Sequence, residues 1–590
     1  MNAPEQRWPA GPGTLAAADT DAASPLSPTE RLDAQVHAAL ARSSGSLSLA
    51  SGLLAAIDWA AHLAVSPGKR LELLCLALQQ GNRLLHYMGS AHTQASDLPV
   101  ADRRFAAPDW QRWPYNLWHQ GFLLTEQWWS AATRDVWGVE KHHADVVSFA
   151  ARQLLDLFSP GNNLLTNPEV LRVTAEQRGN NLLLGLQNCM NDMVGLLLEQ
   201  PTSTDRSFLP GKDVAITPGK VVLRNDIMEL IQYAPAGKAV YPEPLLIIPA
   251  WIMKYYILDL SPANSLIRYL VERGHTVFCV SWKNPGPEDR DLGMDDYLNA
   301  GLHAALDTVN RIVPGQKVHG AGYCLGGSLL AIAAAAMARD GDPRLASLTL
   351  LAAQTDFSEP GELGLFIDES QISLLEAQMQ EAGTLSQTQM AAAFQMLRSY
   401  DLLWSRVIGQ YLMGTPARNS DLMEWNADAT RMPARMHSQY LRRLFLDDDL
   451  SEGRYPVEGK PVALSDINTP VFLVGTVRDH VAPWHSVFKL HYLCPAEITF
   501  VLVSGGHNAG IVSPPGHPRS QFQMRTRPAG GAYCPPDQWA AETPVSEGSW
   551  WPAWQTWLAQ HSGEPTTPPR LGGAKAGRMD DAPGAYIMEK

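Results

Sequence analysis

Residues 317–338 read KVHGAGYCLGGSLLAIAAAAMA, a short apolar run that passes into a stretch rich in small residues. Cys324 stands between Gly322 and Gly326, at the point where a predicted strand becomes a predicted helix. Glycines two residues to either side allow a strand and a helix to close around a residue held at a strained backbone turn. The pattern therefore predicts a strand–turn–helix unit that presents the Cys324 thiol at the carboxyl edge of a sheet.

This G-x-C-x-G pattern is the nucleophile elbow of α/β-hydrolases, with sulfur where oxygen is usual. It makes Cys324 a candidate nucleophile and the amide of Leu325, at the start of the helix, a candidate oxyanion donor. The segment alone leaves a second interpretation open, because free cysteines are often buried core residues. A dinucleotide-binding G-x-G-x-x-G motif starting at Gly320 fails, because Leu325 stands where the third glycine belongs.

Size, charge and cysteine usage exclude several classes of protein. The chain has 590 residues, 45% of them hydrophobic and 18% charged, which is enough for two or three domains with large cores. A formal net charge of −14 and the lack of zinc-ligand spacing argue against nucleic acid as a partner. Six cysteines without a C-x-x-C pair are typical of a reducing compartment. The sequence shows neither a signal peptide nor an apolar run of the ~20 residues that span a membrane, so we expect a cytoplasmic protein without a transmembrane segment.

Composition and predicted secondary structure change twice along the chain. Residues 1–30 are rich in Ala, Pro, Ser and Thr and are predicted to be a disordered leader. Residues 31–210 follow an almost wholly helical pattern and are predicted to form a separate helical domain. Residues 211–590 alternate short strands with helices, which is typical of a doubly wound α/β fold. The six predicted parallel strands are 245–249, 276–280, 317–321, 347–351, 471–474 and 498–503.

A long insertion, about residues 356–450, separates the fourth and fifth predicted strands. Insertions of this length at the functional edge of a sheet are usually lids or caps. We expect a cap over the catalytic edge, and the alternative that the insertion merely packs against the sheet stays open.

Two more residues follow predicted strands where an α/β-hydrolase places the rest of its triad. Asp479 comes after strand 471–474, and His507 lies in the glycine-rich loop after strand 498–503. The chain order nucleophile, acid, histidine is the order found in that fold. His507 is expected to take the proton of Cys324, and Asp479 to orient the imidazole or stabilise its charged form.

Two further predictions concern the neighbours of these groups. His480 is adjacent to Asp479 and is expected to point elsewhere in an extended loop, with a supporting role at most. A second oxyanion amide is expected in the loop after the first core strand, at Trp251.

A sulfur nucleophile also indicates which acyl transfer is energetically favoured. An acyl group on serine is an oxyester, so passing it to an alcohol gains almost nothing. An acyl group on cysteine is a thioester, and its transfer to an alcohol runs downhill. Cys324 therefore suits ester synthesis from a thioester donor, and such an enzyme must keep water out, which gives the insertion a purpose.

The chain resembles the poly(3-hydroxyalkanoate) synthases, which make bacterial polyester granules, and most closely their class I-like, single-subunit type. The resemblance runs from about Asn167 to the C-terminus and rests on ordered peptides. These are VLRNDIMELIQY (222–233), HTVFCVSWKNP (275–285), GYCLGG (322–327), VRDHVAPW (477–484), SGGHNAG (504–510) and GSWWPAW (548–554). One departure is Met253, where the family usually has Asn, and it bears on substrate range and rate.

The resemblance implies a helical N-terminal domain, a capped α/β-hydrolase catalytic domain and a homodimer. It implies that Cys324, Asp479 and His507 are catalytic and that the substrate is an (R)-3-hydroxyacyl-CoA, with CoA as leaving group. The growing polyester chain and the granule surface are the other implied partners, and no metal or other cofactor is implied.

Two alternatives from other functional classes are carried forward. A thioesterase or an intracellular polyester depolymerase would use the same fold and elbow. A noncatalytic granule-surface or scaffold protein would keep the fold with a vestigial triad.

Overall fold

The computed structural model describes residues 27–90, 102–197, 208–387, 389, 403–416, 420–574 and 579–590. Residues 1–26 of the predicted leader lie outside these ranges. Helix α1 (Pro28–Ser43) begins earlier than expected, because Ser27 and Glu30 form a reciprocal capping box.

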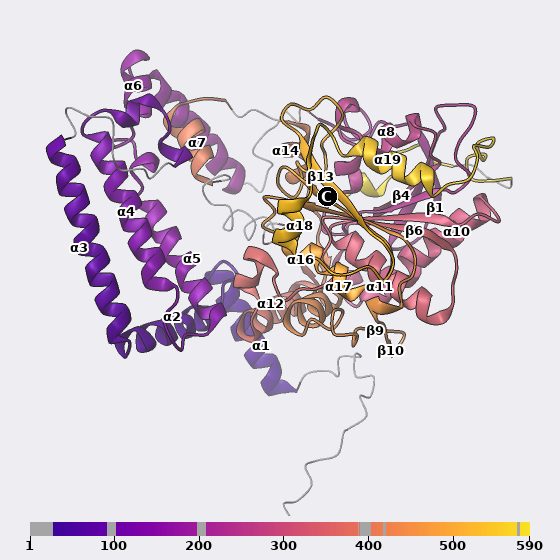
Figure 1. Cartoon of the computed structure of the whole chain (residues 1–590), viewed down its shortest axis with the longest axis horizontal. Helices are drawn as coiled ribbons and strands as arrows, with labels where there is room; N and C mark the ends of the chain where they lie inside the picture. The colour runs from indigo at the N-terminus through magenta and orange to yellow at the C-terminus, as the bar shows by residue number, and fades with distance from the viewer. Residues whose placement is uncertain are drawn as a thin grey trace, which may run out of the picture.

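The described part of residues 31–210 contains helices and short 3₁₀ turns but no named strand. A small core of Phe105, Trp110, Phe122 and Leu123 lies among them. In Figure 1 most of these helices, indigo to violet, stand beside the sheet-containing region rather than around it. They are α1, α2 (Leu49–Ala64), α3 (Pro67–Ser90), α4 (Tyr115–Thr133), α5 (Lys141–Leu157), α6 (Pro168–Glu176) and α7 (Asn180–Leu197).

A ten-stranded sheet organises the rest of the described chain, in the order β1-β2-β4-β3-β5-β6-β11-β12-β13-β14. Its six central strands are parallel and confirm the six predicted strands. They are β3 (Leu245–Ile248), β4 (Val277–Trp282), β5 (Val318–Tyr323), β6 (Leu345–Leu351), β11 (Val471–Thr476) and β12 (Ile498–Val503).

Four antiparallel strands, two at each edge, were not predicted. Strands β13 (Gln521–Arg527) and β14 (Val545–Glu547) are largely exposed and polar, so they lack the continuous apolar run of the central strands. Strand β2 (Met228–Tyr233), which pairs with β1 (Gly219–Arg224), is wholly buried but carries Glu229 and Gln232. The buried Glu229 carboxylate accepts hydrogen bonds from the amides of Ala585 and Tyr586, so the C-terminal segment supplies its partners.

Helices cover both faces of this sheet and share one large core (Figure 1). Helix α11 (Leu325–Asp340) follows β5 directly and is buried along nearly its whole length. Helix α19 (Trp551–Gln560) packs three tryptophans, and the Trp554 indole donates a 2.9 Å hydrogen bond to Thr349 of β6. The remaining covering helices are α8 (Leu266–Glu272), α9 (Met294–Asp296), α10 (Ala304–Ile312), α16 (Trp484–Phe488), α17 (Leu490–Leu493) and α18 (Pro536–Glu542).

The described part of the segment between β6 and β11 supplies much of the wall of a cavity at the carboxyl end of β5. Its helix α12 (Glu369–Ala382) packs against α1, and its turn η10 (Val407–Leu412) packs against α7. The N-terminal helices therefore contact this insertion from two sides. Its other described elements are η8 (Gly361–Phe366), β7 (Thr384–Leu385), α14 (Asp421–Asn426), β8 (Met432–Pro433), α15 (Ala434–Gln439), η11 (Tyr440–Leu446), β9 (Pro456–Val457), β10 (Lys460–Pro461) and η12 (Leu464–Asp466).

Among the described residues, no single helix combines the length and apolarity needed to cross a membrane. In the part of the chain that the structure describes, one pair of helices, α2 and residues 67–89 of α3, reaches that length and apolarity together, and the two are bent by 89° at their junction.

Candidate active site

The turn between β5 and α11 has the geometry that the sequence predicts. Cys324 adopts φ +51° and ψ −124°, a conformation that is costly for a residue with a side chain, and its amide donates a 2.9 Å hydrogen bond to Leu351 of β6. A Cβ on Gly326 would lie 2.6 Å from the carbonyl atoms of Pro249, so only glycine fits where helix and sheet meet. The elbow thus holds Cys324, a buried residue that is 8% exposed, at the carboxyl edge of β5.

Asp479 and His507 meet at the same edge of the sheet. The Nδ1 of His507 shares a 2.7 Å hydrogen bond with Oδ2 of Asp479. The other carboxylate oxygen, Oδ1, accepts 2.9 Å bonds from the amides of Val481 and Ala482, while Thr476 donates to Oδ2. Three donors other than His507 therefore fix Asp479 in place, so that it can hold the imidazole in one orientation.

The protonation of this pair follows from its surroundings. Burial opposes a positive charge on His507, but Asp479 and Cys324, as charges and hydrogen-bond partners, outweigh it and raise the pKa of His507 well above its ordinary value. Burial likewise works to raise the pKa of Asp479, but the charge of His507 and the hydrogen bonds leave that pKa below its ordinary value. The structure therefore brings the three predicted residues together, with a carboxylate beside an imidazole that readily carries a proton.

The two predicted oxyanion amides have different settings. Leu325 is the first residue of α11, so its N–H has no acceptor within the helix, and its side chain lines the cavity that contains Cys324. Trp251 is buried, and its ring packs 5.7 Å from Tyr297 and 6.2 Å from Tyr440. In the same loop, Ile252 reaches the cavity wall, which sequence reasoning did not single out.

His480 and Met253, two residues that the sequence singled out near the site, do not line the cavity that contains Cys324. His480 is exposed, and its backbone carbonyl accepts a 3.2 Å hydrogen bond from the amide of Glu362. Met253 is half-buried and forms an isolated bridge with Ala429 of the insertion. Met253 therefore links the loop after β3 to the insertion without lining the cavity itself.

A cavity of about 220 Å³ adjoins the thiol of Cys324. Most of its wall is apolar and comes from the insertion, including Phe357, Leu375 and Phe445. His437 also lines it, and burial lowers the pKa of His437 to about 4, so this imidazole is neutral near pH 7. An acyl chain next to the thiol would thus lie among uncharged groups. The rest of the lining, including residues from α1–α2 that sequence reasoning missed, is Gly45, Ser46, Leu47, Ile252, Leu325, Ser328, Ala352, Gln354, Leu363, Phe366, Ile367, Gln371, Leu385, Gln389, Tyr440, Leu441, Val481 and Ala482.

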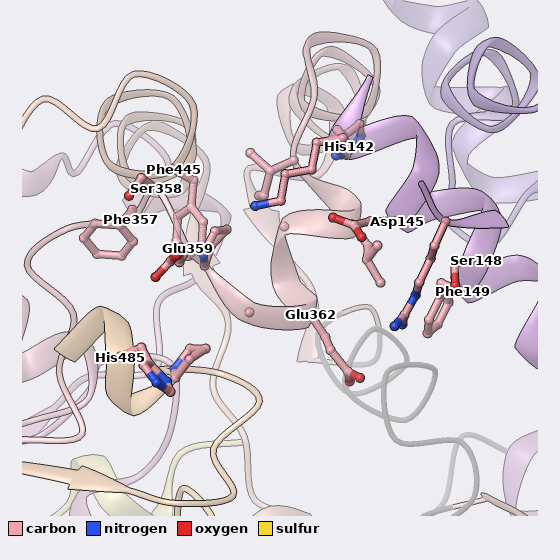
Figure 2. Close-up of a pocket in the computed structure, with 18 of the residues that line it drawn as sticks. His142, Asp145, Ser148, Phe149, Phe357, Ser358, Glu359, Glu362, Phe445 and His485 are labelled. Atoms are coloured by element: carbon pink, nitrogen blue, oxygen red, sulfur yellow. The ribbon is translucent and has the colours of Figure 1, made fainter. Parts of the chain in front are cut away.

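A second, larger cavity of about 1240 Å³ lies between α5 and the loop after β6 (Figure 2). His142 and Asp145 on α5 face this space, as does Glu362 from the insertion (Figure 2). The two cavities share Phe357, Ile367 and Phe445 in their walls, so they are neighbours in the structure. The larger one is lined by charged groups of both signs, unlike the cavity at the thiol.

Within the described ranges, no group of three or more His, Cys, Asp or Glu side chains is placed to hold a metal ion. All six cysteines are free thiols.

These features define the class of the protein. A largely parallel sheet, a cysteine elbow after its β5 strand and an Asp–His pair after β11 and β12 form an α/β-hydrolase fold with a helical N-terminal region. A family model described as alpha/beta hydrolase fold matches residues 243–514 and agrees with this assignment.

Comparison with known proteins identifies the family within that class. Models for the poly-beta-hydroxybutyrate polymerase (PhaC) N-terminus and for the poly-beta-hydroxybutyrate polymerase N terminal match residues 101–270 and 27–69. The chain is 42% identical to a poly(3-hydroxyalkanoate) polymerase of Methylorubrum extorquens, over 83% of this chain and 81% of that one. It is 37% identical to a poly(3-hydroxyalkanoate) polymerase subunit of Rhizobium meliloti, over 85% and 81% of the two chains. The corresponding subunit of Cupriavidus necator is 34% identical over 90% and 91%.

The chain therefore belongs to the poly(3-hydroxyalkanoate) polymerase family, whose members are acyltransferases. This confirms the resemblance inferred from the ordered peptides.

Proposed function

We propose that this protein polymerises (R)-3-hydroxyacyl-CoA thioesters into a polyhydroxyalkanoate polyester, with release of CoA, through an acyl-enzyme on Cys324. The observation that supports the proposal most directly is the buried Cys324 elbow beside the hydrogen-bonded His507–Asp479 pair, in a chain of this family. No metal or prosthetic group takes part in the proposed reaction.

The proposed acylation step uses the charges of the three side chains. The Cys324 thiolate attacks the thioester carbonyl while His507 carries the proton, and the amides of Leu325 and Trp251 stabilise the oxyanion. When the carbonyl re-forms, the carbon–sulfur bond to CoA breaks and the CoA sulfur takes the proton from His507. The product is an acyl-cysteine and free CoA.

The transfer step reverses the proton flow. The 3-hydroxyl of another unit or chain end gives its proton to His507 as its oxygen attacks the acyl-cysteine carbonyl. An ester bond forms, the carbon–sulfur bond breaks, and Cys324 leaves as the thiolate next to protonated His507. Asp479 keeps the imidazole oriented through both steps.

Product analysis separates this function from a thioesterase or depolymerase. Purified protein given (R)-3-hydroxybutyryl-CoA is expected to release free thiol while the solution becomes turbid with polymer. Thiol release accompanied only by soluble hydroxyacid would reject polymerisation and favour the hydrolase alternative.

The acyl-enzyme has its own test. Cys324→Ala is expected to abolish CoA release, because it removes the nucleophile and leaves the fold intact by circular dichroism. Mass spectrometry of trapped wild-type protein should find the acyl unit on Cys324. Near-normal turnover in Cys324→Ala would contradict the mechanism and favour a scaffold role for the elbow.

We further propose that the protein works in the cytoplasm at the surface of polyester granules, as a homodimer. The support for a granule surface is a stripe on α3, where Leu71, Leu74, Leu78 and Leu85 recur at helical spacing and are 56–66% exposed. Large exposed apolar side chains at such spacing suit contact with an apolar body. The homodimer rests on the family resemblance.

A further inference from the structure

The turn between α1 and α2 lies against the cavity that contains Cys324, although it is nearly 280 positions away in sequence. Gly45, Ser46 and Leu47 line that cavity together with Leu375 of α12 and Leu385 of β7. Figure 1 shows α1 beside α12, where the indigo N-terminal helix meets the insertion. A segment of the helical N-terminal region thus supplies part of the cavity wall.

The shape of this turn is set by its own sequence. Gly45 and Ser46 have φ values of +65° and +67°, so the chain reverses sharply after α1. The amide of Ser46 donates a 2.7 Å hydrogen bond to the carbonyl of Ala41, which closes the end of α1. Ser48 then caps α2 by accepting a 3.2 Å bond from the amide of Ser51. Leu47 is consequently held between two helix ends, with little freedom of its backbone.

Hydrogen bonds fasten the turn to α12. The amide side chain of Gln371 donates to the carbonyl of Ser46 at 2.7 Å and accepts from the amide of Ser48 at 2.8 Å. The hydroxyl of Ser46 donates to Gln378 at 3.0 Å, and the hydroxyl of Ser51 donates to Asp368 at 2.6 Å. The position of the turn relative to the insertion is therefore fixed on both sides of Leu47.

Leu47 is the one large apolar side chain that this turn contributes to the wall, and it is half-buried there. We propose that Leu47 is a specificity-determining residue that limits the length of the acyl group accepted beside Cys324. The proposal rests on the proposed polymerase function, since it concerns the acyl part of that substrate. In a cavity of about 220 Å³ the size of one wall residue changes the space for an acyl tail substantially.

The test compares two substitutions of opposite size. Leu47→Ala enlarges the cavity and Leu47→Phe fills it. For each variant, kcat/KM for CoA release is measured with (R)-3-hydroxyacyl-CoAs of four, six and eight carbons. Because one methylene in an apolar pocket changes discrimination by roughly tenfold or more, the ratio of long to short substrates should rise about tenfold in Leu47→Ala and fall in Leu47→Phe.

Two more variants complete the test: one removes a hydrogen bond that holds the α1–α2 region to the insertion, and the other is a matched control. Ser51→Ala removes the 2.6 Å hydrogen bond from α2 to Asp368 at a residue outside the cavity wall, and should move the ratio in the same direction as Leu47→Ala. Leu32→Ala, a substitution of the same type at a 60% exposed position of α1, should leave the ratio unchanged.

The failure of this inference is distinguishable from failure of the polymerase function. If wild-type protein releases CoA and forms polymer, but both Leu47 variants keep the wild-type ratio or shift it in the same direction, Leu47 does not set acyl length. If wild-type protein forms no polymer from any of the substrates, the polymerase function itself is wrong.

Discussion

At the scale of single residues, the candidate site depends on a charge arrangement that burial alone would forbid. Asp479 is buried and His507 is half-buried, and each favours the charged form of the other, while the amides of Val481 and Ala482 also stabilise the Asp479 carboxylate. Cys324, 8% exposed, lies beside this pair and is one of the groups that raise the pKa of His507. The reactivity of Cys324 is therefore predicted to depend on Asp479 through His507.

Asp479→Asn is expected to lower kcat for CoA release by about 100-fold or more, since general acid–base catalysis is worth at least that factor. KM should change little, because Asp479 does not line the substrate cavity. Steady-state kinetics with His480→Gln as control, a change at the exposed neighbouring residue, provides the measurement. Equal rates for both variants would show that the acid is not Asp479.

The pair also predicts how stability depends on pH. The pKa of Asp479 is lowered, so its contribution is present above the ordinary value of 3.8 and is lost as pH falls through the lowered value. The pKa of His507 is raised, so its contribution is complete below 6.5 and is lost as pH rises through the raised value.

The difference in melting temperature between wild type and His507→Gln should thus be largest between about pH 4 and pH 6.5 and shrink on either side. Thermal melts across this range, with His480→Gln as control, measure it. A difference that grows steadily with pH would contradict the assigned charge state.

At the scale of elements, the strand–turn–helix unit around Cys324 is built on close backbone approach. Helix α11 can lie against the loop after β3 only because Gly326 has no side chain. The covering insertion then closes the cavity over that contact. A change in the packing of the elbow is therefore expected to change access to the thiol as well.

Gly326→Ala is expected to destabilise the protein by about 2–4 kcal/mol, because the added methyl group overlaps the Pro249 carbonyl. Gly81→Ala is the matched change in open space on α3 and should stabilise by about 0.5–1 kcal/mol. Urea unfolding followed by circular dichroism compares the two. A Gly326→Ala variant as stable as wild type would mean that the elbow tolerates separation of helix and sheet.

At the scale of the whole molecule, the N-terminal helices have two separate faces. One contacts the insertion through α1 and α7, and another exposes the leucine stripe of α3. The first face adjoins the cavity at Cys324, and the second is the one proposed to contact a polyester surface. The two can therefore be tested independently.

Leu71→Glu combined with Leu78→Glu should reduce binding to polyester particles while leaving CoA release from soluble substrate near the wild-type rate. Charges on the stripe disfavour transfer to an apolar surface but remain solvated in the free protein. Co-sedimentation with purified polymer particles measures binding. The control carries Met524→Glu and Val545→Glu, two exposed apolar positions on β13 and β14. Equal loss of binding in both double variants would argue against a specific stripe.

The sequence alone determined the central sheet, the elbow and the order of Cys324, Asp479 and His507. These follow from local patterns: continuous apolar runs mark buried parallel strands, and a glycine-flanked cysteine marks a close turn. The edge strands escaped prediction because their side chains are polar, and the predicted domain boundary at 210 stays a prediction, because residues 198–207 lie outside the described residues.

Only the tertiary structure decided how distant segments meet at the thiol. Leu47 lines the cavity of Cys324 from nearly 280 positions away in sequence, and Gln371 holds the backbone of the turn there from more than 320 positions away. No periodicity or motif encodes such a contact, because it arises from the packing of α1 on α12. Local chemistry fixed what can react, and long-range packing fixed the space in which it reacts.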